Sequence, residues 1–438
     1  MRALSLLAGL ALALAAAASP VAAQAPAPGR TDPALNALAA PLYAQLAALK
    51  GIASPGPPPP VLLRTREENR RFIEQELDRR YSPARVESER KGMIAWGLIP
   101  ANYDLRRLFV DLMQEQVAAY YDPRAKVMVL GDWLSPEQQQ SALMHELVHA
   151  LQDREIPLDQ FISPDPGRGD QLLARQALVE GEAVALTFEL VLMSQGGDFA
   201  SLPDLAPLRE MISAGMSGPA VSVAPKFMRD LLVFPYIEGL RFVHEFRKRQ
   251  PWSAISALYR DPPRSSSQIL RPEKRLASRE DPVPIALPDL RKELGGAPPV
   301  AEDELGEFAL SAVVGLHLGE VAGRAAAAGW RGDRYRVWED QPGRFALAYL
   351  LMMSSEPAAN SFALTYTTVL ERRHPQLTRK GVPGRSGAIV TWREGDRAFV
   401  VEKRGAEVLV LERMPAATAD RIRETIWRAR AAAPAGVR

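Results

Sequence analysis

Two histidines four positions apart, with a glutamate directly after the first, are the residues of this chain best suited to chemistry. His145, Glu146 and His149 stand in the stretch 142–153, which reads A-L-M-H-E-L-V-H-A-L-Q-D. Positions i and i+4 of an α-helix lie on one face, one turn apart. Two imidazoles placed in this way can hold one Zn²⁺, and the glutamate between them can act as a general base toward a zinc-bound water. The spacing therefore predicts a hydrolytic zinc site.

A catalytic zinc needs a third protein ligand and one open coordination position. Because the chain has no cysteine, that ligand must be a histidine or a carboxylate. The next suitable carboxylates stand in L-V-E-G-E-A, residues 178–183, and Glu180 follows His149 by 180 − 149 = 31 positions, enough for a loop and a returning helix. Glu182 points about 160° further round that helix. We predict Glu180 as the ligand, with Glu182 as the alternative or as a group that supports a ligand from behind.

The helix that must carry the two histidines begins with a strong start signal. Ser135, Pro136 and Gln138 fit the N-cap, N1 and N3 positions, and apolar residues follow through the motif. Two β-prone segments, 117–121 and 126–130, are joined by a D-P-R turn and predict a β-hairpin directly before this helix. We expect 126–130 to be an edge strand along which an extended peptide could align.

The helix that must carry Glu180 is predicted over about 170–193, with Asp170 as its N-cap. Its small residues Ala177 and Gly181 are expected to let it pack closely against the histidine helix.

Hydrolysis also needs a donor that stabilises the developing oxyanion. Tyr236 and Arg271 are our candidates for this donor, each weighed against a role in packing or in a surface ion pair. Asp153 follows His149 by four residues and could orient that imidazole, although an ordinary carboxylate at the helix C-terminus is the preferred interpretation.

The composition limits both the location and the partners of the protein. Met1 and Arg2 precede an Ala/Leu run, and the small residues V-A-A at 21–23 fit the exit of a secretory signal peptide. We therefore expect export to the periplasm or secretion, with no transmembrane segment in the mature chain. The 54 Lys and Arg residues nearly balance the 52 Asp and Glu residues, which argues against bulk binding of nucleic acid.

Proline-rich stretches and changes of pattern divide the chain into five predicted parts. A helix over 302–328, three alternating strands within 389–411 and a closing helix over 418–431 characterise the last of them. The predicted parts are a signal peptide at 1–23, an Ala/Pro-rich segment and linker at 24–60, a metallopeptidase domain at 61–280, a linker at 281–300 and a C-terminal domain at 301–438. The predicted fold class is α+β: a zincin-like, mainly helical domain with a small β-sheet, followed by a smaller α+β domain.

The motif pair His145–His149 and E-G-E-A at 180–183 resembles the gluzincin metallopeptidases. Thermolysin-like enzymes, collagenases and zinc aminopeptidases combine H-E-x-x-H with a glutamate on a following helix. In the last two groups that glutamate often begins an E-G-x-A string, so the resemblance also favours Glu180. The Asp that thermolysin-like enzymes carry four residues later is Val184 here.

The wider pattern resembles a group of exported bacterial metallopeptidases. The chain shares with this group the strings Y-D-P at 121–123, H-E-L-x-H-A-L-Q-D at 145–153 and E-G-x-A at 180–183. The resemblance covers roughly 61–280, with a further element at 329–333. Residues 262–274 read P-P-R-S-S-S-Q-I-L-R-P-E-K, where the group has P-P-x-S-T-E-Q-I-L-H-P-E-K. The departures are Ser266, Ser267 and Arg271, the last in place of a histidine.

The resulting hypothesis is zinc-dependent hydrolysis of peptide bonds in the cell envelope, with one Zn²⁺ per chain and a peptide or protein as substrate. Glu146 would activate the zinc-bound water. A scaffold or chaperone that keeps zinc for structure, and a zinc amidase acting on cell-wall peptides, are the alternatives. The sequence indicates no oligomeric state.

Overall fold

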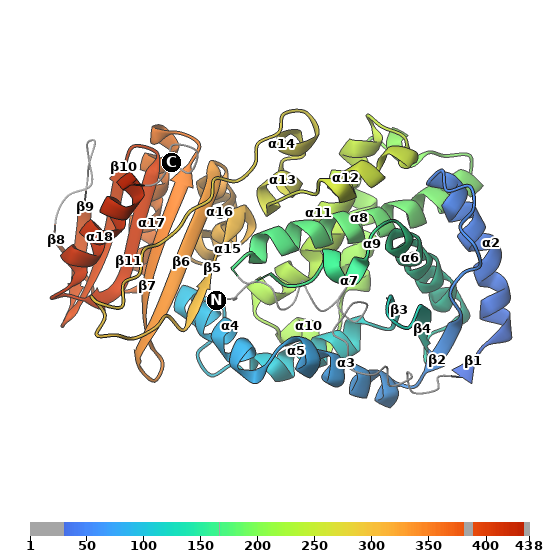
Figure 1. The fold of residues 1–438 in the computed structure, drawn as a ribbon, viewed down its shortest axis with the longest axis horizontal. Coiled ribbons are helices and arrows are strands. Elements are labelled where there is room, and N and C mark those ends of the chain that lie inside the picture. The colour runs from blue at the N-terminus through green and yellow to red at the C-terminus, as the bar shows by residue number, and fades with distance from the viewer. Residues whose placement is uncertain (1–29, 166, 381–388, 433–438) are drawn as a thin grey trace.

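The computed structural model describes residues 30–165, 167–380 and 389–432 and is shown in Figure 1. The predicted signal peptide at 1–23 lies outside the described residues. Within the described ranges, no helix combines the length and the apolar character needed to cross a membrane.

Residues 30–276 are mainly helical and carry one small sheet. Their helices are α2 (Pro33–Leu49), α3 (Arg66–Arg80), α4 (Pro83–Trp96), α5 (Leu105–Gln116), α6 (Pro136–Glu155), α7 (Leu158–Phe161), α8 (Gly169–Ser194), α9 (Ala206–Gly215), α10 (Pro219–Val223), α11 (Lys226–Arg247), α12 (Ser256–Arg260), α13 (Ser266–Leu270) and α14 (Glu273–Leu276), with 3₁₀ turns at Phe199–Ser201 and Trp252–Ala254.

The small sheet contains four strands in the order β1-β2-β4-β3. They are β1 (Arg30–Thr31), β2 (Val61–Arg64), β3 (Ala119–Asp122) and β4 (Val127–Gly131). The predicted hairpin is confirmed, because β3 and β4 pair antiparallel. The prediction that 126–130 forms an edge strand is wrong, since β2 pairs in parallel with the other side of β4. Among the strands that the structure describes, the unpaired edge beside the histidine helix belongs to β3.

The predicted start of the histidine helix is confirmed. Ser135 accepts a hydrogen bond from the backbone N–H of Gln138, and the Gln138 side chain bonds back to the Ser135 N–H. This capping box and Pro136 at the first helical position fix where α6 begins. His145 and His149 therefore lie in the second half of a helix whose register is set from its first turn.

Residues 301–380 and 389–432 form a seven-stranded antiparallel sheet with helices, at the left of Figure 1. The strand order is β5-β6-β7-β11-β10-β9-β8. The elements are β5 (Ala301–Asp303), α15 (Gly306–Leu318), α16 (Glu320–Ala327), β6 (Trp330–Gln341), β7 (Arg344–Met353), α17 (Glu356–Arg373), β8 (Thr378–Lys380), β9 (Ile389–Glu394), β10 (Arg397–Arg404), β11 (Glu407–Pro415) and α18 (Ala419–Ala432).

The predicted strands within 389–411 and the closing helix are present, but the predicted helix over 302–328 is wrong. Its first residues pair with β6 as strand β5. Gly319 then separates α15 from α16 with φ of 89°, a conformation that glycine adopts without steric cost.

The sheet forms the middle of three layers. Tyr349 and Leu351 of β7 belong to the large core that continues into the helical half, where the Tyr349 ring packs edge-on against Trp96 of α4. Leu350 faces the other way, into a second core with Trp427 of α18 and Leu287. Residues around Leu287 come from the stretch 281–300, so this predicted linker packs onto the sheet. The domain boundaries themselves stay a prediction.

The start of α8 is bound by carboxylates from the C-terminal sheet region. Asp303 accepts a hydrogen bond from the Gly169 N–H at 3.0 Å, and Glu304 accepts a longer one from the Gln171 N–H at 3.4 Å. The prediction that Asp170 caps this helix is wrong, because the N-cap position is Arg168. Asp170 instead accepts from the Ser266 N–H at 2.9 Å and ties α8 to α13.

Candidate metal centre

Three side chains from α6 and α8 converge on one point. His145 Nε2 lies 3.1 Å from Glu180 Oε2 and 3.2 Å from His149 Nε2. His149 Nε2 lies 3.6 Å from Glu180 Oε2. Among the described residues, this is the group of His, Cys, Asp and Glu side chains whose ligand atoms gather closely enough for a metal ion. The structure thus brings together the three residues predicted as ligands.

The spacing and chemistry of these atoms fit one tetrahedral zinc ion. Two imidazole nitrogens and a carboxylate oxygen form a common set for catalytic zinc, and ligand atoms about 2.05 Å from one tetrahedral ion stand about 3.3 Å apart. The His145 side chain keeps 21% of its surface exposed, whereas His149 keeps 6% and Glu180 keeps 3%. Solvent therefore reaches the cluster beside His145, where a fourth position would be open.

The charges of the metal-free cluster are strongly coupled. Burial favours neutral His149, but the negative charge of Glu180 outweighs it and raises the pKa of His149 to about 9. Burial likewise opposes the ionised form of Glu180, yet the charge of His149 and bonds from both histidines lower its pKa to about 2. The cluster thus holds an ion pair that a metal would replace.

Glu146 lies outside the ligand group and faces the edge strand. Its Oε2 accepts a hydrogen bond from the Tyr121 N–H of β3 at 2.7 Å. Burial raises the pKa of Glu146 above its usual value, against the opposing charges of the two histidines. A carboxylate whose pKa is raised in this way is suited to accept a proton near neutral pH.

Glu180 also receives a hydrogen bond from α11. The Tyr236 hydroxyl donates to Glu180 Oε1 at 3.2 Å, and its ring stacks toward that of His145 with centroids 6.4 Å apart. The small residues of α8 let this helix pack closely, as predicted, but the close contact of Gly181 is with α11 and not with the histidine helix α6. Gly181 meets Gly239 of α11 rather than the histidine helix, and a Cβ on Gly181 would lie 2.2 Å from the Gly239 carbonyl carbon.

Glu182 points away from the cluster, into a buried network behind it. It accepts hydrogen bonds from Lys50, Tyr259 and the amide of Gln152, the last at 2.8 Å. Gln152 in turn contacts His149 Nδ1 at 2.7 Å. The structure therefore places Glu182 with the groups that support a ligand, which was one of the two roles considered for it.

The other predicted site residues have partners elsewhere. Arg271 forms an ion pair with Glu307 of α15 at 2.9 Å, and none of its described contacts reaches the metal cluster. Its proposed part in catalysis stays a prediction. Asp153 accepts from the Tyr121 hydroxyl at 2.9 Å and from the Leu158 N–H at 3.1 Å. It thus ties the end of α6 to its neighbours instead of orienting His149.

Sequence reasoning missed three contributors: Lys50, Tyr121 and Gln152. Lys50 ends α2 and reaches the site across the fold, and Tyr121 contributes a backbone group, so no local signal identifies either one. Gln152 could have been found, because it follows His149 by three positions and shares its helix face.

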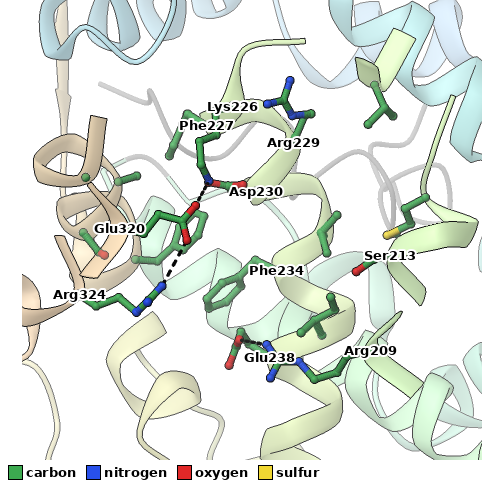
Figure 2. Close-up of a pocket in the computed structure, with 18 of the residues that line it drawn as sticks. Arg209, Ser213, Lys226, Phe227, Arg229, Asp230, Phe234, Glu238, Glu320 and Arg324 are labelled. Atoms are coloured by element: carbon green, nitrogen blue, oxygen red, sulfur yellow. Dashed lines mark hydrogen bonds and ion pairs between the residues drawn. The ribbon is translucent and has the colours of Figure 1, made fainter. Parts of the chain in front are cut away.

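A cavity lies apart from the metal cluster. It has a volume of about 770 Å³ and lies between α9, α10 and α11 on one side and α15 and α16 on the other. Figure 2 shows Phe234 between the ion pairs of Lys226 with Glu320 and of Glu238 with Arg209, all of which line this cavity. Asp230 lines this cavity, whereas Gly239 faces α8. The two residues point to opposite sides of α11, about 180° apart.

Two family models match parts of the chain. Residues 102–192 match Peptidase_M78, described as an IrrE N-terminal-like domain, and residues 294–423 match DUF8575, a domain of unknown function. Searches of curated proteins and of solved structures gave no significant match. The first match spans α5 to α8 and so contains His145, Glu146, His149 and Glu180. This similarity supports a metallopeptidase in that part of the chain.

Proposed function

We propose that the protein hydrolyses peptide bonds with a zinc ion held by His145, His149 and Glu180. The observation that carries this proposal is the convergence of the three ligand atoms within 4.8 Å, inside a region similar to Peptidase_M78. A zinc ion in such a site acts as a Lewis acid and lowers the pKa of its water toward ~7.

The surrounding residues would supply the remaining steps. Glu146, one position after His145, would take the proton of the attacking water and pass it to the leaving amine. The free edge of β3 would align an extended substrate by backbone hydrogen bonds. The Tyr121 N–H on that edge already donates to Glu146, so substrate and base would meet at the same residue. The Tyr236 hydroxyl is the nearest candidate donor for the developing oxyanion.

We further propose that the protein works outside the cytoplasm. This part of the proposal rests on the apolar N-terminal sequence and its small-residue exit at 21–23.

The Glu146→Gln variant tests the hydrolytic role. The amide introduced by this substitution cannot take up a proton, so cleavage of an unfolded protein or of a peptide library should fall at least ~10²-fold. Zinc content should stay near that of the wild type, because Glu146 is not a ligand. Glu137→Gln, on the exposed first turn of the same helix, is the matched control and should cleave normally. Full activity in Glu146→Gln would overturn the proposal.

A further inference from the structure

The amide of Gln152 has one allowed orientation in the buried network behind the metal cluster. Its nitrogen lies 2.9 Å from the carbonyl oxygen of Val179 and 2.8 Å from a carboxylate oxygen of Glu182. Neither oxygen can donate a hydrogen bond, so both must face the NH₂ group. The Gln152 oxygen is therefore the atom that faces His149.

This orientation decides where His149 carries its proton. The Gln152 oxygen lies 2.7 Å from His149 Nδ1 and can only accept. Nδ1 must then carry a proton in both the charged and the neutral ring. In the neutral ring that would bind zinc, the lone pair is therefore on Nε2, the nitrogen that faces His145 and Glu180. Orienting groups of this kind fix the tautomer of metal-bound histidines in many proteins.

The network that holds the amide is closed off from water and has a cation beside its buried carboxylate. Gln152 and Glu182 are fully buried, and the Lys50 side chain has no exposed surface. Lys50 binds Glu182 and also lies 3.6 Å from Glu155, so the buried carboxylate has a cation beside it. The Tyr259 hydroxyl donates to Glu182 as well. Removal of any of these partners would leave a polar group buried without compensation.

We propose that Gln152 is a positioning residue that fixes the tautomer of His149 and so presents its Nε2 to the metal. Glu182 and the carbonyl of Val179 hold the amide in the required orientation. We call the contacts from Glu182 through Gln152 to His149 the relay, and Lys50 links this relay to the N-terminal helix α2. The inference rests on the proposed zinc site, but it concerns zinc binding and protonation rather than turnover.

Two measurements test the relay. The first is the zinc dissociation constant, determined by competition with a chelator, in wild type, Gln152→Leu and Gln176→Leu. Gln176 is an equally buried glutamine on α8 whose amide atoms have no hydrogen-bond partner within the described part of the chain, so it provides a matched control. We expect zinc binding 10- to 100-fold weaker in Gln152→Leu and unchanged in Gln176→Leu. Equal affinity in all three proteins would overturn the relay.

The second measurement needs no variant and so does not depend on folding of Gln152→Leu. In the zinc-loaded wild type labelled with ¹⁵N-histidine, NMR should show His149 protonated at Nδ1 and coordinated through Nε2. Coordination through Nδ1 would contradict the inference. Wild type that binds zinc tightly but cleaves nothing would overturn the proposed function and leave the relay intact. If the wild type cleaves peptides and Gln152→Leu binds zinc as tightly as the wild type, the relay is overturned and the proposed function stands.

Discussion

Gly181 of α8 and Gly239 of α11 lie in backbone contact. A Cβ on Gly239 would lie 2.1 Å from the carbonyl oxygen of Ala177, and one on Gly181 would lie 2.2 Å from the Gly239 carbonyl carbon. Only glycine at both positions permits this distance between the helices. The contact sets how closely Tyr236 approaches Glu180, and it gives the glycine of the E-G-E-A string a physical reason.

Gly181→Ala should therefore separate the two helices. Overpacking of this kind typically costs about 1–3 kcal/mol of stability, and zinc affinity should fall because Glu180 moves with α8. Unfolding in urea and chelator competition measure both effects. Gly215→Ala is the control, since Gly215 is helical and, of the residues that the structure places, none has an atom within 4 Å of its added Cβ. Equal stability of the two variants would argue against the close contact.

Tyr236→Phe removes the hydroxyl that bonds to Glu180 and keeps the ring beside His145. If this hydroxyl stabilises the transition state, kcat should fall roughly 10²-fold or more, with little change in KM or zinc content. Steady-state kinetics on a defined peptide separate these quantities. A variant with wild-type kcat would exclude Tyr236 as the oxyanion donor.

The ion pair of the metal-free cluster should make stability depend on pH. The pKa of His149 is raised to about 9, so its contribution is full below the unfolded value near 6.5 and is lost as pH rises through 9. The pKa of Glu180 is lowered to about 2, so its contribution is present above about 4.5 and is lost as pH falls toward 2. Metal-free protein should be most stabilised by the pair between about pH 4.5 and 6.5.

The loss of stability on the alkaline side of this pH range is the part that is practical to measure. Between pH 6.5 and 9 the free energy of unfolding of zinc-free wild type should fall by on the order of 3 kcal/mol more than that of zinc-free His149→Gln. Denaturant unfolding at the two pH values gives this difference. Parallel pH profiles for the two proteins would show that the pair does not stabilise the apo state.

Asp303 should contribute to the stability of the helix that carries Glu180. Its buried carboxylate accepts from the Gly169 N–H at the start of α8, and lost caps typically cost about 1 kcal/mol. Asp303→Ala should lower the free energy of unfolding by at least this amount. Asp396→Ala, at a turn where the side chain is 76% exposed, should change it by less than about 0.5 kcal/mol. No difference between the variants would mean that β5 does not support α8.

Local signals allowed much of the site to be predicted. The capping box at Ser135 and the i, i+4 histidines depend on neighbours within one or two helical turns, and both are seen in the structure. Helix geometry showed that Glu180 and Glu182 point to different sides of one helix and cannot both be ligands, and the resemblance to the gluzincins favoured Glu180. The first two of these inferences need only helix geometry and the sequence itself.

Contacts between distant segments were not predictable in the same way. The parallel pairing of β2 with β4 makes β3 the free edge, and it depends on a strand 66 positions earlier (127 − 61). Gly181 was recognised as a residue for close packing, but its partner, Gly239, is 58 positions away (239 − 181). Lys50 lies in a segment whose composition suggests a linker, although it binds the buried Glu182. Tertiary packing alone sets these relationships.

The most direct test of the zinc site is metal content measured beside hydrolysis in wild type, Glu180→Ala and Glu189→Ala. Glu189 is another buried carboxylate on α8, and it accepts a hydrogen bond from the Phe199 N–H outside the cluster. The account predicts one zinc per chain and peptide cleavage in wild type and Glu189→Ala, with loss of both in Glu180→Ala. Stoichiometric zinc and full cleavage in Glu180→Ala would contradict it.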